Sequence, residues 1–230
     1  MRVYTNEPLI LRRARLGKIA TFVGLGFLIG GLVISLTLQQ SPWFWLSFAC
    51  LLLGLLASSI GTFNLSRWVR EPRADQALAL GLKGFDDRYR LYNYLLPAPH
   101  VLLSPVGLYV LTAMGQDGVI RYEGGRFRRD FSLGRLLRFM ADEGLGRPFE
   151  MADEEVRALQ RFLAAHGVEG VEVQSLVVFY HPRARLELSE TPRPVVEPKR
   201  LKKVIRAQSG SKLSGSQYQQ LLDLFEGVAA

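Results

Sequence analysis

A long uncharged stretch dominates the first third of the chain. No Lys, Arg, Asp or Glu occurs from Ile19 through Ser66, and the segment Gln39-Gln40-Ser41-Pro42 divides this stretch in two. The first half, 19–38, would form about 30 Å of helix, which matches one hydrocarbon thickness, and the second half, 43–66, is slightly longer. Lipid offers backbone N–H groups no partner, so helices suit both halves. The pattern predicts two transmembrane helices.

Basic residues flank this predicted hairpin and are missing from its turn. They are Arg2, Arg12, Arg13, Arg15 and Lys18 before the first helix, and Arg67, Arg70 and Arg73 after the second. The positive-inside rule then predicts a multi-pass protein of the inner (plasma) membrane with both termini in the cytoplasm. A cleaved signal peptide is the alternative, but the apolar segment is longer than a usual signal core and a second span follows directly.

Small residues recur in both apolar segments. Gly26-x-x-x-Gly30 has the spacing at which helix backbones approach closely in membranes, and Gly54, Ser58 and Gly61 offer small residues in return. We expect these positions to pack the two helices together, with homodimerisation as the alternative.

The rest of the chain alternates strand-like and helix-like patterns. Helices are predicted at 74–82, from Ser132, from Asp153 to Gly167, at 199–207 and at 217–225, and strands at 89–95, 100–104, 108–112, 119–122, 126–130 and 174–180. This order predicts an α/β (α+β) domain with a mixed sheet. The expected organisation is a basic N-terminus at 1–18, membrane helices at 19–66, the α/β domain at 67–188, and a proline-containing linker with C-terminal helices at 189–230.

Composition narrows the function classes. Apolar residues make up 48% of the 230 and charged residues 22%, which excludes a disordered chain. A single cysteine excludes a disulfide framework and a zinc site built on several thiolates. The net charge of +8 falls to +4 for residues 67–230, which hold 24 of the 29 basic residues and 20 of the 21 acidic ones. That is well below the charge of a nucleic-acid-binding arm.

The middle of the chain, residues 73–182, contains a series of short motifs in a distinctive order: Leu82-Lys83-Gly84-Phe85, Leu95-Leu96-Pro97, the run from His100 to Leu111, Asp117-Gly118-Val119-Ile120 and Val177-Val178-Phe179. By this motif order the segment resembles the nuclease-related domain (NERD) family. The resemblance implies a restriction-endonuclease-like fold and cleavage of phosphodiesters by a divalent metal, Mg²⁺ or Mn²⁺, held by carboxylates.

The residues at the family's catalytic positions do not suit that chemistry. Where the resemblance places an Asp and a Glu-x-Lys, this chain has Pro99, Thr112 and Met114, and only a helix carboxylate is retained, as Asp75. Pro, Thr and Met cannot replace carboxylate ligands or the lysine. The resemblance therefore implies a catalytically degenerate domain that binds or scaffolds and needs no cofactor.

An active metal-dependent nuclease with relocated ligands is the alternative. Its weak candidates are Asp75 and Asp117, with Asp86, Asp87 and Glu123 nearby, but these residues have the setting of turns. His100, at the start of a strand, has the setting of a hydrogen-bonded structural histidine.

Binding is the remaining class, and two basic clusters are its candidates. The first is the helix with Lys199, Arg200, Lys202, Lys203 and Arg206 around an apolar stripe, and the second contains Arg126, Arg128, Arg129, Arg135 and Arg138. Nucleic acid and anionic lipid headgroups both suit such clusters, while a merely solvated helix face is the plain interpretation. Besides the lipid bilayer itself, a protein partner in a membrane complex is the third possibility.

Overall fold

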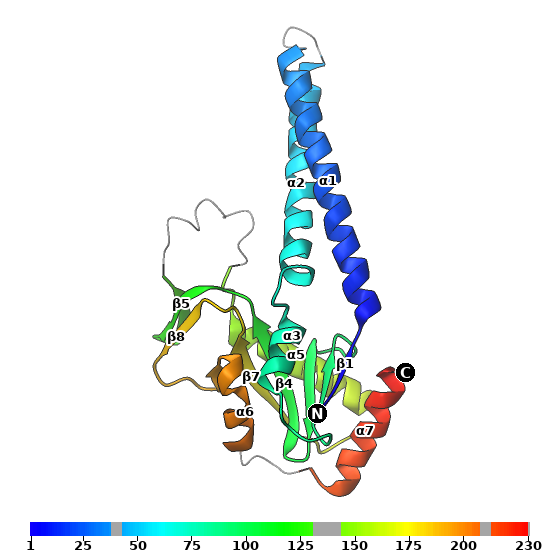
Figure 1. Ribbon diagram of the computed structural model, residues 1–230, viewed down its shortest axis with the longest axis vertical. Coiled ribbons are helices and arrows are strands. Elements are labelled where there is room, and N and C mark those ends of the chain that lie inside the picture. The colour runs from blue at the N-terminus through cyan, green and yellow to red at the C-terminus, as the bar shows by residue number, and fades with distance from the viewer. Residues whose placement is uncertain (38–42, 131–143, 208–212, 230) are drawn as a thin grey trace. The chain divides into compact units, whose positions relative to one another are not determined.

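The chain folds into two units, a helical hairpin and an α/β domain, seen in a computed structural model (Figure 1). The structure describes residues 1–37, 43–130, 144–207 and 213–229. Among these, Glu7–Arg73 form the hairpin unit, while Met1–Asn6 and the residues from Ala74 onward form the domain. The expected hairpin and the mixed α/β class are both confirmed, and the expected turn of the hairpin and the helix from Ser132 lie outside the described residues.

The hairpin consists of α1 (Glu7–Thr37) and α2 (Phe44–Trp68). Both helices are long and apolar enough to cross a membrane. Most of their large apolar side chains are exposed in the isolated chain, as lipid-facing side chains would be. α1 begins twelve residues before the uncharged stretch, so Arg12, Arg13, Arg15 and Lys18 extend the same helix.

Small residues spaced by seven hold α1 against α2. Gly17, Gly24 and Gly31 are the buried glycines of α1, and Ser47, Gly54 and Gly61 are buried in α2 at the same interval. A repeat of seven keeps one stripe facing a partner helix when the two supercoil left-handedly. The expectation was right in placing Gly54, Ser58 and Gly61 at this contact.

The expectation was wrong for Gly26 and Gly30. A Cβ added at either glycine would have nothing within 4 Å, whereas one at Gly24 would lie 2.4 Å from the Ser58 hydroxyl and 2.9 Å from the Gly54 carbonyl. The spacing of four was the wrong repeat for this pair, because the helices stay in contact along a period of seven.

The domain contains two mixed sheets. The larger has the order β1-β2-β3-β4-β7-β9, in which β2, β3 and β4 are antiparallel neighbours and β1–β2, β4–β7 and β7–β9 are parallel pairs. The smaller has the order β6-β5-β8. The strands are β1 (Arg2–Thr5), β2 (Arg90–Asn93), β3 (His100–Ser104), β4 (Gly107–Met114), β5 (Gly118–Glu123), β6 (Arg126–Arg129), β7 (Val173–Phe179), β8 (Ala184–Leu188) and β9 (Val195–Val196).

Helices cover both faces of the larger sheet. Leu103, Val110 and their neighbours on one face pack against α5 (Pro148–Ala165) and α7 (Gly215–Ala229). Leu102, Leu111 and their neighbours on the other face pack against α3 (Ala74–Gly81) and α6 (Pro198–Ala207). Because β3, β4 and β7 are buried on both faces, they show as continuous apolar runs in the sequence.

Two boundaries differ from the expected organisation. The segment 189–230 is no appendage, because β9, α6 and α7 supply Val196, Leu201 and Phe225 to the two clusters that cover the sheet. α5 begins at Pro148 and not at Asp153, since proline suits the first turn of a helix, where its missing N–H has no partner to lose.

The N-terminus is also part of the domain. β1 pairs in parallel with β2 from Arg2↔Arg90 to Thr5↔Asn93, so the segment expected as a basic N-terminus at 1–18 is divided between this strand and the start of α1. Tyr4 stacks on Tyr92 with ring centroids 5.0 Å apart. Since the chain on both sides of the hairpin joins one folded unit, a membrane crossed by α1 and α2 has both flanks of the hairpin on the same side.

This topology predicts how introduced cysteines are labelled. In a Cys50→Ser background, Arg2→Cys and Glu169→Cys should react alike with an impermeant maleimide in sealed vesicles, and Trp45→Cys, at the turn end of α2, should react from the opposite side. Opposite labelling of positions 2 and 169 would contradict the pairing of β1 with β2.

The packing of the hairpin predicts different costs at two neighbouring glycines. Gly24→Leu should destabilise the α1–α2 pair by roughly 1–3 kcal/mol because its side chain meets α2 backbone, and Gly26→Leu should leave the pair unchanged. All three tryptophans, Trp43, Trp45 and Trp68, lie at the two ends of α2, so tryptophan fluorescence during SDS-induced unfolding reports on this unit. Equal destabilisation by Gly24→Leu and Gly26→Leu would contradict a helix contact that follows the seven-residue repeat.

Candidate functional site

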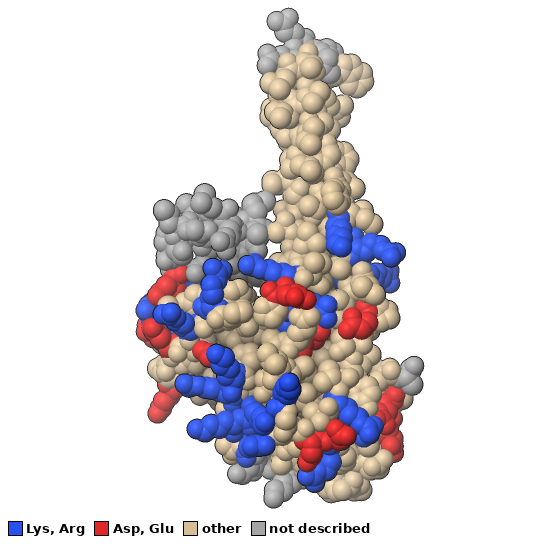
Figure 2. Space-filling view, viewed as in Figure 1, with Lys and Arg blue, Asp and Glu red and all other residues tan. Residues whose placement is uncertain are grey.

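α6 presents one apolar and one basic face. Leu201 and Ile205 are fully buried against the domain core. Lys199, Arg200, Lys203 and Arg206 are exposed, and Lys202 is half-buried. Figure 2 shows Lys and Arg side chains gathered over this part of the domain.

Except for Arg206, which lies favourably in the last turn, the charges of α6 are arranged unfavourably for the helix dipole. Lys199 and Arg200 lie in the first turn, where the helix dipole disfavours cations. Lys199, Lys203 and Arg206 follow one another at intervals of four and three, and like charges at these spacings cost a few tenths of a kcal/mol for each pair. In the part of the chain that the structure describes, no carboxylate forms an ion pair with any of the five cations. The sequence thus concentrates positive charge here at a cost to stability.

The segment after α3 completes this surface. Lys202 Nζ donates to the carbonyl of Lys83 at 2.9 Å, and Lys202 and Arg206 lie 5.6 Å and 5.2 Å from the centre of the Phe85 ring. Gly84 has a φ of +90°, and a Cβ there would lie 2.9 Å from Lys202 Nζ. We call the surface formed by Lys83, Lys199, Arg200, Lys202, Lys203 and Arg206 the basic face.

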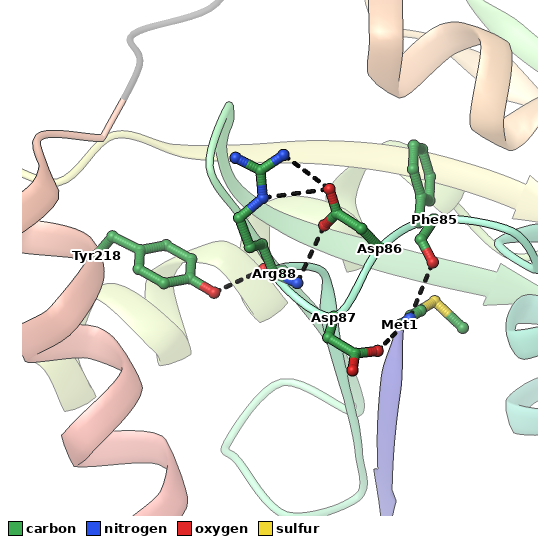
Figure 3. A network of polar contacts seen from close by, with 6 residues as sticks. All are labelled: Met1, Phe85, Asp86, Asp87, Arg88 and Tyr218. Carbon is green, nitrogen blue, oxygen red and sulfur yellow. Dashed lines mark hydrogen bonds and ion pairs between the residues drawn. The ribbon is translucent and has the colours of Figure 1, made fainter.

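A polar network fixes the loop that carries Phe85 (Figure 3). The Met1 ammonium donates to the Phe85 carbonyl at 2.8 Å and to Asp87 at 3.0 Å, and Tyr218 of α7 donates to the Arg88 carbonyl at 2.6 Å. Hydrogen bonding to the Met1 ammonium lowers the pKa of Asp87, and hydrogen bonding to Arg88 lowers the pKa of Asp86. These two carboxylates, candidates for a relocated metal site, instead hold the loop in place.

The arginines of the second predicted basic cluster do not form a single site among the described residues. Arg126 and Arg128 are exposed, but Arg129 is nearly buried in an ion pair with Asp117. Arg183 also pairs with Asp117, at 2.6 Å. Arg135 and Arg138 lie outside the described residues.

Asp117 is therefore a structural anchor of the smaller sheet. Burial raises the pKa of Asp117, but the hydrogen bond from Arg129 and the charges of Arg129 and Arg183 outweigh it and hold the pKa below its ordinary value of 3.8. This clamp explains why an aspartate that looked like a turn residue is three-quarters buried.

The positions at which the family would place its ligands are occupied by structural contacts. Thr112 is buried in β4 and donates to Glu155 of α5 at 2.6 Å, and Met114 is buried at the end of the same strand. The Pro99 carbonyl accepts from the Tyr94 N–H at 2.7 Å, and Asp75 is buried in the first turn of α3. Over residues 1–37, 43–130, 144–207 and 213–229 no three His, Cys, Asp or Glu side chains come together as metal ligands.

His100 belongs to a buried polar cluster at the ends of three neighbouring strands. Its Nδ1 lies 2.9 Å from the side-chain oxygen of Asn93, whose amide nitrogen donates to Thr5 at 3.1 Å. Tyr94, with a φ of +59°, packs its ring edge-on against His100. The expected structural, hydrogen-bonded histidine agrees with these contacts.

The clamp around Asp117 predicts a pH-dependent loss of stability. Because the pKa of this group is lowered on folding, its stabilisation is present at neutral pH and is lost as the pH falls through the folded pKa. Asp117→Asn should cost roughly 1–3 kcal/mol at pH 7 and progressively less below pH 4, measured by thermal unfolding of the full chain in neutral detergent. Asp223→Asn, an exposed carboxylate of α7 hydrogen-bonded to Gln219, is the control with little expected cost. A cost for Asp117→Asn that is the same at pH 7 and pH 3 would contradict the clamp.

Comparison with known proteins supplies no relative from which a function could be transferred. The chain matches no protein-family model, no curated protein and no solved structure. The resemblance to the nuclease-related domain family therefore rests on motif order alone.

Proposed function

We propose that this protein is a membrane-anchored, non-catalytic module that binds nucleic acid through the basic face. The observation that carries the proposal is the row of cations along α6 without carboxylate partners among the described residues. A helix that places like charges together against its own stability gains from an external polyanion. Phosphates supply the missing negative charge.

Binding is favoured over catalysis by the contacts at the family's catalytic positions. Thr112 is committed to Glu155, and Met114 to the apolar cluster that also contains Phe179. The nearby aspartates 86, 87 and 117 are committed to an ammonium or to arginines. A degenerate nuclease-related domain, which keeps the binding partner of its relatives and not their chemistry, agrees with both observations.

Nucleic acid is favoured over a lipid surface by the burial of the apolar side of α6. Helices that bind membranes combine electrostatic attraction with insertion of an apolar face. Leu201 and Ile205 are fully buried in the domain, so α6 has no apolar face to insert. The cations from Lys199 to Arg206 extend over about 10 Å of helix, and duplex DNA presents one charge for about every 1.7 Å of its axis.

The location of the module follows from the flanks of the hairpin. The basic end of the hairpin is formed by Arg12, Arg13, Arg15 and Lys18 of α1, Arg67 in the last turn of α2 and Arg70 just after α2, and it suits anionic headgroups. The positive-inside rule places this end, and with it both flanks, in the cytoplasm. The protein would thus hold nucleic acid at the inner face of the membrane.

The test uses the full chain in nanodiscs of neutral lipid, because a fragment starting at residue 67 would lack β1. Wild-type protein should bind fluorescent duplex DNA with an affinity that falls as salt rises. Lys199→Gln/Lys203→Gln/Arg206→Gln should weaken binding at least tenfold at about 50 mM salt and reduce the log–log salt slope by about 2–3, since each phosphate contact contributes about 0.9.

A matched variant removes three exposed cations elsewhere, Arg157→Gln/Arg161→Gln/Arg185→Gln, and should bind like wild type. If both triple variants lose the same DNA affinity, the loss reflects net charge and not the basic face, which would contradict the proposal. If Lys199→Gln/Lys203→Gln/Arg206→Gln loses binding to anionic vesicles but binds DNA like wild type, the result would overturn the proposal in favour of lipid. Mg²⁺-dependent cleavage of the DNA by the wild-type protein would overturn the non-catalytic assignment.

A further inference from the structure

A pocket opens between the turn that joins β5 to β6 and the start of α5. Its volume is about 480 Å³, and Gly125, Arg126 and Phe127 line one side while Arg147, Phe149 and Glu150 line the other. A pocket of this size suits a small metabolite. Neither the basic face nor the Asp117 clamp contributes to this lining, so the pocket is a separate feature of the domain.

The charges of the pocket favour an anion. Arg126 is exposed and has no ion pair with a described carboxylate, although Glu123 faces it in the strand register. Arg147 Nη1 donates to both carboxylate oxygens of Glu150 at 3.0 and 3.1 Å. Arg126 thus has no ion pair with a described carboxylate, Arg147 is paired with Glu150 through Nη1, and guanidinium groups match phosphate in geometry.

The backbone adds to this preference. α5 begins at Pro148, which has no N–H, and no side chain caps the first turn of the helix. The N–H groups of the next residues lie at the positive end of the helix dipole. A Cβ at Gly125 would have nothing within 4 Å, and one at Gly146 would meet only Met151 Sδ at 3.8 Å, so a ligand can approach the backbone at the turn between β5 and β6.

Two aromatic rings line the same pocket. Phe127 and Phe149 are half-buried, with ring centroids 4.9 Å apart, and Tyr122 and Phe179 pack behind them. The packing fixes the two rings, and their exposed surface offers a flat group an apolar contact. A ligand that contacts both the arginines and the aromatic rings of the pocket therefore carries both a negative charge and a flat ring.

We infer that this pocket binds a mononucleotide, with its phosphate at Arg126, Arg147 and the start of α5 and its base against Phe127 and Phe149. The inference is independent of nucleic-acid binding by the basic face, because the two surfaces share no residue. Inorganic phosphate can contact only the arginines and the start of α5, and an unphosphorylated nucleoside can contact only the two aromatic rings.

Calorimetric titration of the full chain in neutral detergent tests this inference. AMP should bind, adenosine and inorganic phosphate should each bind at least tenfold more weakly, and Arg126→Gln should weaken AMP binding at least tenfold. Arg128→Gln, on the same strand but outside the pocket, is the matched control and should bind AMP like wild type. Both variants alter exposed side chains, so neither is expected to disturb folding.

The outcomes separate this pocket from the basic face. Retained AMP binding by Lys199→Gln/Lys203→Gln/Arg206→Gln supports a distinct site even if DNA binding fails in every protein tested. Absence of AMP binding, equal affinity for AMP and inorganic phosphate, or AMP binding that is lost only in the α6 variant would overturn the inference.

Discussion

The backbone ladder between β1 and β2 joins the first residues of the chain to a strand that follows both apolar helices. Four residue pairs in register, from Arg2↔Arg90 to Thr5↔Asn93, close this edge of the larger sheet. The Met1 ammonium, Tyr4 and Asn6 add hydrogen bonds to the loop after α3, to α7 and to the end of β2. As a result the domain is attached to the hairpin at two points, through Asn6 and through residues 69–73. Both proposed binding surfaces belong to the domain whose sheet edge β1 forms.

Sequence patterns predicted the elements whose signal is local. The runs of β3, β4 and β7 are apolar on both faces, and α6 and α7 have clear helical periodicity, so each was found within a few residues of its bounds. β1, β8 and β9 were missed because they are short and become strands only by pairing with distant partners. The glycines were misassigned for a related reason: the spacing of four in Gly26 and Gly30 is visible at once, whereas the spacing of seven in Gly17, Gly24 and Gly31 has meaning only against a second helix.

The same distinction applies to the candidate sites. The cations of α6 are visible in the sequence because they lie within eight residues, but the contact of Lys202 with Lys83 joins residues 119 positions apart and has no sequence signal. Arg126 and Arg129 looked equivalent in the sequence, yet alternation along β6 exposes one and turns the other toward Asp117. No pattern could have brought Phe149 beside Phe127, since that contact needs the smaller sheet and α5 to be in place.

The position of β1 in the chain also constrains how the protein is made. β1 is synthesised before its partner β2, which follows 88 residues later and, at about 5–20 residues per second, after a delay of roughly 4–18 seconds. During that interval both apolar helices are synthesised, so the sheet is completed only after both helices have been made. β1 is only four residues long and begins with the charged Arg2, and both its length and this charge limit mispairing with other nascent chains.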